Sequence, residues 1–344
     1  MTLVLRGTLL RHLGLAVVAG IVMAVVLTQV EPFTDYQLAS VAFFAIAAAG
    51  LTVLTGLNGQ LSLGHGALMA VGGYTTSLLL QRYINMPVVL AMVASVVAAA
   101  AAAVVVGAAA ARLRGPYLAG ATLALAVGLP GITVAFAGTF HGDQGIPVAP
   151  LIPPDFLGPD YTPERWIALV SLACALVTFV LLANLKRSRF GRDFRAIRDD
   201  EVAAALSGVR VARNRVTAFV LSGACAGLSG SLFALWAGIT ARSGFSLSLS
   251  LQLLAAVVIG GLGTLPGAIW GAFAVVFLPP LANNATDLAH LPGSVRDNLP
   301  LAIYGAVFMV TMLTFPNGIQ GGIHLLRLRL RRLFRQSGNS VKAK

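Results

Sequence analysis

The sequence predicts an all-α fold, a polytopic membrane helix bundle of about 8–10 membrane segments, from three observations. Of the 344 residues, 57% are hydrophobic and only 10% are charged, which is more apolar surface than a soluble chain of this length covers. Apolar runs such as residues 88–111 are continuous and lack the period-two alternation of a transmembrane β-barrel. The basic residues gather between or beside the apolar runs, which is typical of membrane topology.

The net charge of +12 is explained by three clusters that hold 18 of the 24 Lys and Arg residues. They are Arg6 with Arg11, residues 186–215 and residues 327–344. Such clustering follows from the positive-inside rule, so it indicates cytoplasmic segments and excludes nucleic acid as the main partner. The last cluster has the pattern of an amphipathic basic helix on anionic membrane lipid.

The polar segment 186–215 orients the whole chain. It holds nine of the 24 basic residues and lies between two apolar spans, which predicts a cytoplasmic loop. The expected organisation is a cytoplasmic N-terminus (1–11), a transmembrane domain (12–322) and a basic cytoplasmic tail (323–344). The transmembrane domain carries this loop and a proline-rich external loop at 139–165.

Hydropathy gives the order of the elements. An acidic external turn is expected at 31–35, after a first span that is retained rather than cleaved. The spans are expected at about 12–30, 37–56, 59–80, 88–111, 117–138, 166–185, 216–238 and 299–314.

The apolar stretch 251–280 is expected to be broken. As one helix it would be about 45 Å long, too long for a single straight crossing. Gly260, Gly261 and Gly263 interrupt it, so we expect two short segments with a hinge near Gly263. Irregular backbone at membrane depth is tolerated only inside protein or beside a cavity. The GxxxG row that begins at Gly263 favours an intersubunit or pathway-lining role over plain packing.

Within the cytoplasmic loop, residues 192–208 are expected to form one helix that Gly208 ends. Small and apolar residues would share one face of this helix with Glu201. That face suits docking into a groove of another protein. The alternative is a solvated linker helix whose basic residues face phospholipid.

The chain resembles the permease subunits of branched-chain amino-acid ABC transporters of the LivM type. Four stretches carry the resemblance, in the order of the family: GLNGQLSLGHGALMAVGGYTTSLL at 56–79, GRDFRAIRDDEVAAALSGVRVARNRVTAFVLSGACAGLSG at 191–230, VIGGLGTLPGAIWG at 258–271 and FPNG at 315–318. It implies a helical permease that moves branched-chain amino acids (leucine, isoleucine and valine) across the cytoplasmic (inner) membrane. The implied partners are cytoplasmic ATPase subunits, a second related permease and an extracytoplasmic binding protein.

In such importers the cytoplasmic loop docks on the ATPase through the pattern Glu-Ala-Ala, three residues, Gly. Here Gly208 places the glutamate position at Val202, and Glu201 comes one residue early, so the pattern is degenerate. The residues expected to couple to the ATPase are Arg192, Phe194, Arg195, Arg198, Asp199, Glu201, Ala203, Ala204 and Gly208.

A polar stripe along the span at 59–80 predicts the substrate pathway. Its members recur at spacings of three and four, as on one face of a helix: Asn58, Ser62, His65, Met69, Gly72 and Thr76, with Gln60 beside them. Polar groups at that depth face protein or water rather than lipid. We take Asn58, Gln60, Ser62, His65 and Gly263 as pathway residues. Interhelical hydrogen bonding is an equal alternative, and is favoured for His65 alone.

The chain lacks the residues of several catalytic classes. It has no GxxxxGK[ST] phosphate loop and no clustered metal ligands, so we expect no enzyme activity, metal or cofactor, with ATP hydrolysis on separate subunits. An importer of urea, amides or other amino acids is an alternative. An ion-coupled secondary transporter would need a second broken segment and buried ionisable groups, neither of which the sequence indicates.

Overall fold

The computed structural model describes residues 14, 18–23, 25, 27, 29–113, 115–155, 158, 161–288, 305, 306, 309, 310, 313, 314 and 318–323. These residues form an all-α membrane bundle, as the sequence predicts. The described residues between 14 and 29 are helical. The elements that follow are α2 (Pro32–Leu51), the π-helix η1 (Thr52–Leu57), α3 (His65–Arg82), α4 (Val88–Ala110), α5 (Pro116–Ala135), α6 (Ala137–Phe140), β1 (Ile146–Pro147), α7 (Pro163–Arg187), α8 (Arg189–Asp199), α9 (Glu201–Leu206), α10 (Val211–Ala237), β2 (Ile239–Thr240), the 3-10 helix η3 (Arg242–Phe245), α11 (Leu247–Gly260) and α12 (Leu265–Leu288).

Five described helices are long and apolar enough to cross a membrane. They are Pro32–Leu57, Val88–Ala110, Tyr117–Ala135, Pro163–Arg187 and Val211–Ala237. Two shorter apolar helices, Leu247–Gly260 and Leu265–Leu281, account for the broken stretch.

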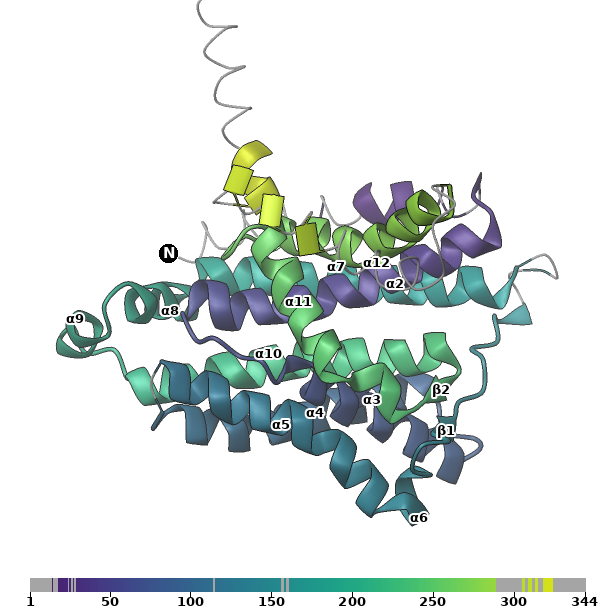
Figure 1. Ribbon diagram of the computed structural model, residues 1–344, viewed down its shortest axis with the longest axis horizontal. Coiled ribbons are helices and arrows are strands. Elements are labelled where there is room, and N and C mark those ends of the chain that lie inside the picture. The colour runs from purple at the N-terminus through teal and green to yellow at the C-terminus, as the bar shows by residue number, and fades with distance from the viewer. Residues whose placement is uncertain are drawn as a thin grey trace, which may run out of the picture.

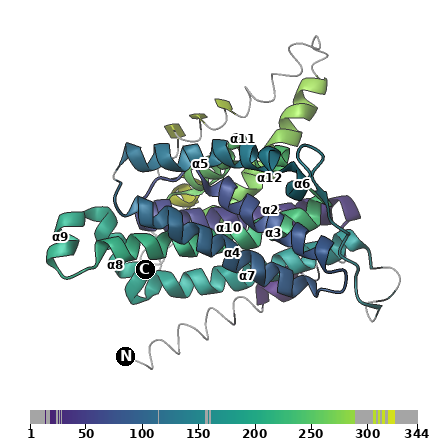
Figure 2. The same cartoon turned by 90° about the horizontal axis from the view of Figure 1, so that it is seen from below.

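The long helices lie roughly along the longest axis of the molecule (Figures 1 and 2). Helices α8 and α9 of the basic loop 186–215 project at one end, and α6 with the small β1–β2 pairing lies at the other. Helix α10 packs against α4, α3 and α2, while α2 also packs against α7 and α12. The bundle is therefore built around α2 and α10.

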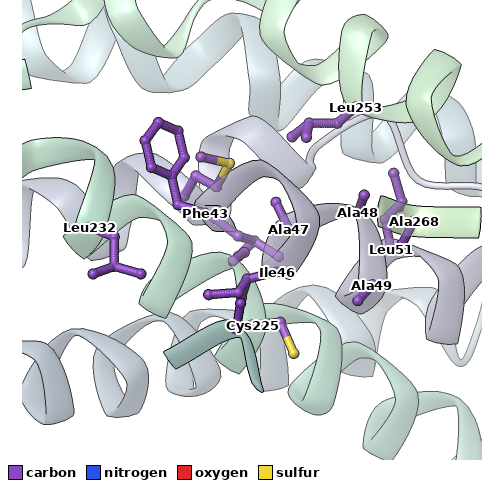
Figure 3. Packing of buried hydrophobic residues seen from close by; sticks show 14 of the residues in the cluster. Phe43, Ile46, Ala47, Ala48, Ala49, Leu51, Cys225, Leu232, Leu253 and Ala268 are labelled. Atoms are coloured by element: carbon purple, nitrogen blue, oxygen red, sulfur yellow. The ribbon is translucent and has the colours of Figure 1, made fainter. Parts of the chain in front are cut away.

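Burial confirms that these two helices form the centre. Within their most apolar windows, 83% of the α2 span and 72% of the α10 span are buried, against 22–33% for the other three. Phe43 and Ile46 of α2 lie close to Leu232 of α10 in the core (Figure 3). Helices that are apolar on all sides are expected at such a position, since no face needs water.

Close backbone contacts hold α3 and α4 to α10. A Cβ on Gly72 of α3 would lie 2.3 Å from the carbonyl oxygen of Gly227 in α10. A Cβ on Gly227 would in turn meet the carbonyl of Ser95 in α4 at 2.6 Å. Small residues let helices approach this closely in a membrane, where packing rather than the hydrophobic effect drives association.

The break in the stretch 251–280 is confirmed. Helix α11 ends at Gly260 and α12 begins at Leu265, with positive φ at Gly261 (119°) and Gly263 (76°) between them. A Cβ on Gly271 would meet the Ala256 carbonyl at 2.0 Å, so the GxxxG row packs α12 onto α11. Gly267 and Gly271 pack within this chain, and the intersubunit or pathway-lining role expected for the row stays a prediction.

Two element boundaries differ from the sequence prediction. The span expected at 59–80 begins as a helix only at His65, because residues 58–64 are not helical. The acidic turn expected at 31–35 is also shorter: α2 starts at Pro32, which suits the first turn of a helix, and Asp35 is buried. Most of the expected span at 299–314, the N-terminus 1–11 and the tail from residue 324 lie outside the described residues.

We predict that Gly72→Ala destabilises the bundle, whereas Gly120→Ala does not. The new methyl group at position 72 has no room against α10, and overpacking costs about 1–3 kcal/mol. Nothing lies within 4 Å of a Cβ at Gly120 in α5, where alanine gains about 1 kcal/mol of helix propensity. Thermal unfolding of the purified chain in detergent should show shifts of opposite sign. Equal shifts would contradict the close contact.

Candidate functional site

The candidate site is the non-helical segment 58–64, which joins η1 to α3. The helical path of α2 first widens into the π-helix Thr52–Leu57 and then stops at Asn58. Gly59 has a positive φ of 76°, which favours glycine and turns the chain out of the helix. Interrupted helices of this kind, and π-helical turns, are frequent at functional sites in membrane transporters.

Two side chains and one backbone carbonyl from three other helices hold this segment and the start of α3. Leu63 N donates to Thr122 Oγ1 of α5 at 3.0 Å, and Gly66 N donates to Ser250 Oγ of α11 at 3.0 Å. Gln60 Nε2 donates to the Arg215 carbonyl of α10 at 3.4 Å. These bonds replace the helical hydrogen bonds that the segment lacks, as the backbone requires in a membrane. Thr122, Ser250 and Arg215 were not expected from the sequence, because their contacts join distant parts of the chain.

Four of the five predicted pathway residues lie on or beside this segment and are buried: Asn58, Gln60, Ser62 and His65. The Asn58 and Gln60 side chains hydrogen-bond each other. Their remaining atoms Asn58 Nδ2 and Gln60 Oε1 have no partner among the described residues, and neither does Thr52 Oγ1 of η1. Buried polar atoms without partners are rare, so each is a place for water or a bound ligand.

The predicted polar stripe is only partly a helix face. His65, Met69, Gly72 and Thr76 do lie on one face of α3, but Asn58 and Ser62 belong to the non-helical segment. The spacing of three and four at those two positions is therefore coincidental. The His65 ring lies between Ser222 Oγ of α10, 3.4 Å from its Nδ1, and the backbone of Ala47 in α2. It joins three helices.

The second interruption, between α11 and α12, lies directly against the first. A Cβ on Gly56 in η1 would be 2.3 Å from the Gly263 nitrogen, so the two backbones touch. Gly263 therefore lies next to the segment 58–64 because it contacts Gly56. The other glycines of its GxxxG row contact α11 instead. The sequence predicted both places as pathway elements but gave no sign that they meet.

Two cations of the basic loop 186–215 reach these interruptions. Arg198 Nη1 of α8 donates to the Gly56 carbonyl at 3.0 Å, and Lys186 Nζ at the end of α7 donates to the Gly263 carbonyl at 2.8 Å. The Arg198 side chain also lies over Gly59, where a Cβ would approach its Cγ to 2.9 Å. Carbonyls released by a broken helix are thereby satisfied by the loop.

The loop contains two helices rather than the single helix expected at 192–208. Asp200 has an extended backbone and its carboxylate accepts hydrogen bonds from Val202 N and Ala203 N, so it ends α8 and caps α9. The sequence reasoning missed this because the aspartate stands inside an otherwise helical pattern. The docking face expected for one continuous helix therefore does not form.

The predicted coupling residues divide into inner and outer groups. Phe194 and Ala204 are buried within the chain, so they anchor the two short helices instead of offering a surface. The outward side of α9 carries Val202 and Leu206, which are 68% and 85% exposed. Helix α9, which carries both residues, forms the tip of the projecting end in Figure 1.

The remaining coupling residues lie around this tip or along α8. Glu201 pairs with Arg215 of α10 at 2.8 Å, and Asp199 pairs with Arg198 at 2.8 Å. Ala203 and Gly208 are exposed on the α9 side. Arg192 and Arg195 instead border a groove beside α7 and α12.

The opposite end of the bundle is tied by one buried ion pair. Arg165 Nε at the start of α7 lies 3.2 Å from Asp35 Oδ2 in the first turn of α2. The Arg165 guanidinium also lies 5.8 Å from the ring centre of Tyr161. These contacts fix the expected external ends of α2 and α7 to each other.

Two apolar stretches of this chain are interrupted, and the two interruptions lie against each other. Buried polar side chains at the interruptions and a basic loop that reaches both define a membrane transport subunit. The chain belongs to the family described as "Branched-chain amino acid transport system / permease component", whose profile matches residues 33–314. It is thus a permease-type integral membrane protein, as the resemblance of its motifs implied.

Curated relatives agree with this assignment. The chain is 28% identical over 302 residues to the high-affinity branched-chain amino acid transport system permease protein LivM of Escherichia coli K12, covering 80% of this chain and 67% of that protein. It is 23% identical to the corresponding LivH protein of Salmonella typhimurium, covering 81% of this chain and 91% of that protein. The autoinducer 2 import system permease protein LsrC of Klebsiella pneumoniae is 37% identical over a shorter region, 38% of each chain. No solved structure was found to match.

We predict that Gly59→Ala frees the Arg198 side chain, while Gly208→Ala does not. Both glycines have positive φ, 76° and 84°, so both variants carry the same kind of backbone strain. Only the methyl group at position 59 collides with Arg198; nothing lies within 4 Å of a Cβ at Gly208.

Limited trypsin proteolysis in native membranes, with mass spectrometry of the fragments, measures the difference. Cleavage after Arg198 should rise several-fold in Gly59→Ala and stay near the wild-type level in Gly208→Ala. Equal cleavage in the two variants would show that Arg198 is not held at Gly59.

Proposed function

We propose that this chain is the permease subunit of an ATP-driven importer of branched-chain amino acids, with its loop 186–215 on the cytoplasmic side. The main observation that supports this proposal is the pair of hydrogen bonds from Arg198 and Lys186 to the two helix interruptions. A loop that only connected two spans would not need to satisfy carbonyls inside the bundle. The LivM and LivH relatives supply the substrate class.

In this proposal the interruptions at 58–64 and 261–264 form the gate of the substrate pathway. Asn58, Gln60, Ser62, His65 and Gly263 line it or support it. The unpartnered atoms of Thr52, Asn58 and Gln60 would bind the polar groups of an amino acid when the segment opens. These groups are neutral, so they bind a zwitterion through hydrogen bonds without holding a fixed charge in the membrane.

The driving force is proposed to enter at the tip of α9. An ATPase subunit binds the exposed Val202 and Leu206, and ATP-driven motion of that subunit moves α8 and α9 together. Arg198 and Lys186 carry the motion to Gly56 and Gly263, which changes the packing of the two breaks against each other. This is alternating access by rigid elements that pivot at glycine breaks.

The proposal implies three kinds of partner and one orientation. Cytoplasmic ATPases dock at α9, a related permease completes the pathway, and an extracytoplasmic binding protein delivers substrate near the end that carries Arg165. Both chain termini are cytoplasmic, because the basic clusters lie at the ends of the sequence. ATP hydrolysis belongs to the partner subunits.

We predict that the double variant Val202→Asp with Leu206→Asp stops uptake by preventing ATPase docking. Two carboxylates at an apolar contact remain desolvated and unpaired, which costs several kcal/mol. Uptake of labelled leucine into cells should fall to background, and mass spectrometry should no longer detect ATPase subunits with the purified tagged chain.

The matched control is Ile84→Asp, which changes a residue that is 92% exposed in the turn after α3. It should keep both leucine uptake and the ATPase subunits. If the wild type took up urea but not leucine, the proposed substrate would be wrong, but the conclusion about ATPase docking at α9 would be unaffected. Retention of the ATPase by the double variant would refute α9 as the docking element.

We predict that Arg198→Ala uncouples transport from ATP hydrolysis. A hydrogen bond from a charged donor contributes about 1.5–3 kcal/mol, so its loss should lower the uptake rate roughly tenfold or more. ATP hydrolysis by the purified transporter should continue, because the α9 tip is unchanged. The ratio of leucine transported to ATP hydrolysed in proteoliposomes measures the coupling.

Arg198→Lys and Arg213→Ala are the controls. Lysine keeps a cation that can donate to the Gly56 carbonyl, so it should restore part of the ratio. Arg213 is exposed at the start of α10 and away from both breaks, so its loss should leave the ratio unchanged. A parallel fall of uptake and hydrolysis in Arg198→Ala would assign Arg198 to docking instead of to transmission.

A further inference from the structure

A groove of about 830 Å³ runs between α7, α8 and α12, and of its lining residues only Lys186 takes part in the proposed transport mechanism. Its size lies within the range of about 300–1,000 Å³ that is typical of sites for small molecules. Its walls are apolar at one end and basic at the other. The apolar lining residues are Ala19, Leu176, Phe179, Val180, Ala183, Leu265, Pro266 and Ile269.

The basic end is formed by four cations: Lys186, Arg187, Arg192 and Arg195. No acidic side chain lines the groove among the residues that the structure describes. The ion pairs of this loop lie elsewhere, at Arg198–Asp199 and Arg215–Glu201. Lys186 donates one hydrogen bond to a carbonyl, at Gly263, and Arg192 donates one to Arg187 O, so most of their donors are left for an anion.

The apolar end continues into a second cavity of about 290 Å³ between Ala19, Met23 and Leu27, which are helical, and the helices α2, α7 and α12. Ala19, Leu176, Phe179 and Ile269 line both cavities, so the two spaces adjoin. The second cavity is lined by Met23, Leu27, Leu38, Val41 and other apolar residues, and no charged side chain in the described part of the chain lines it. The combined shape is therefore a basic head beside a long apolar slot.

We propose that this groove binds one anionic phospholipid, with its phosphate at the four cations and an acyl chain along α7 and α12. Charge complementarity selects the headgroup, and the charge-free slot selects a chain rather than a free anion. Basic pockets between membrane helices at the cytoplasmic surface are suited to such headgroups. The groove also adjoins the break between α11 and α12, because Lys186 lines the groove and donates a hydrogen bond to the Gly263 carbonyl in that break. The proposal does not depend on which substrate is transported.

Native mass spectrometry of the full-length, delipidated chain tests the proposal by titration with phosphatidylglycerol and with phosphatidylcholine. Phosphatidylglycerol should bind at least tenfold more tightly. Arg187→Gln with Arg195→Gln should weaken its binding at least fivefold. The matched control, Arg210→Gln with Arg213→Gln, removes the same charge from a separate pocket and should change its affinity less than twofold.

A third variant separates a lipid from a free anion. Ala183→Trp fills the apolar wall and keeps every cation, so it should weaken phosphatidylglycerol binding at least fivefold without changing the affinity for inorganic phosphate. Equal affinity for the two lipids, or equal losses in the two double variants, would overturn the proposal. So would an Ala183→Trp variant that binds phosphatidylglycerol normally, or absence of the lipid from the transporter purified with its partner subunits. The thermal unfolding midpoint of each variant verifies folding.

Discussion

The contact between Gly56 and Gly263 is the constraint on which the rest of the site depends. Two helices that break inside a membrane release carbonyl and N–H groups that lipid cannot satisfy. Here the two breaks lie against each other, where a side chain on Gly56 would clash with the Gly263 backbone. Their free polar groups are then satisfied by partners from other elements: Thr122, Ser250 and Arg198 at the first break, and Lys186 at the second.

The surrounding bundle makes this arrangement stable. The packing of α10 against α3 and α4 depends on glycine positions such as Gly72 and Gly227, whose backbones nearly touch. Hydroxyl groups of neighbouring helices bond one another across the same interface, with Thr76 of α3 bonded to Ser231 of α10 at 2.7 Å. Such a scaffold is rigid, so motion is concentrated where helical hydrogen bonds are absent, which is at 58–64 and 261–264.

Much of the fold follows from the sequence by length and hydropathy alone. The apolar runs and the basic loop predicted the helices, and the cluster Gly260, Gly261 and Gly263 predicted the broken segment because it interrupts an apolar stretch too long for one straight crossing. The interruption at 58–64 was missed because Asn58, Ser62 and His65 happen to keep helical spacing. The break at Asp200 was missed because a single capping carboxylate outweighs the helix propensity around it.

The candidate site was predicted residue by residue but not as a unit. The sequence singled out Gln60, Arg198 and Gly263 for separate roles in the pathway and the docking loop. Only the three-dimensional structure brings them together, because each contact joins positions that are far apart in the chain, as from Arg198 to Gly56. Lys186 carried no signal beyond its charge, since a lysine at the end of a span is ordinarily explained by topology.

The same geometry explains how a short loop can act on the centre of the bundle. The tip of α9 is exposed and contributes little to the core, whereas Phe194 of α8 is fully buried. A force applied at the tip therefore moves α8 as a rigid piece, since bending it would expose Phe194. In the proposed mechanism the Arg198 side chain follows α8, and its bond to Gly56 transmits the displacement to the non-helical segment 58–64.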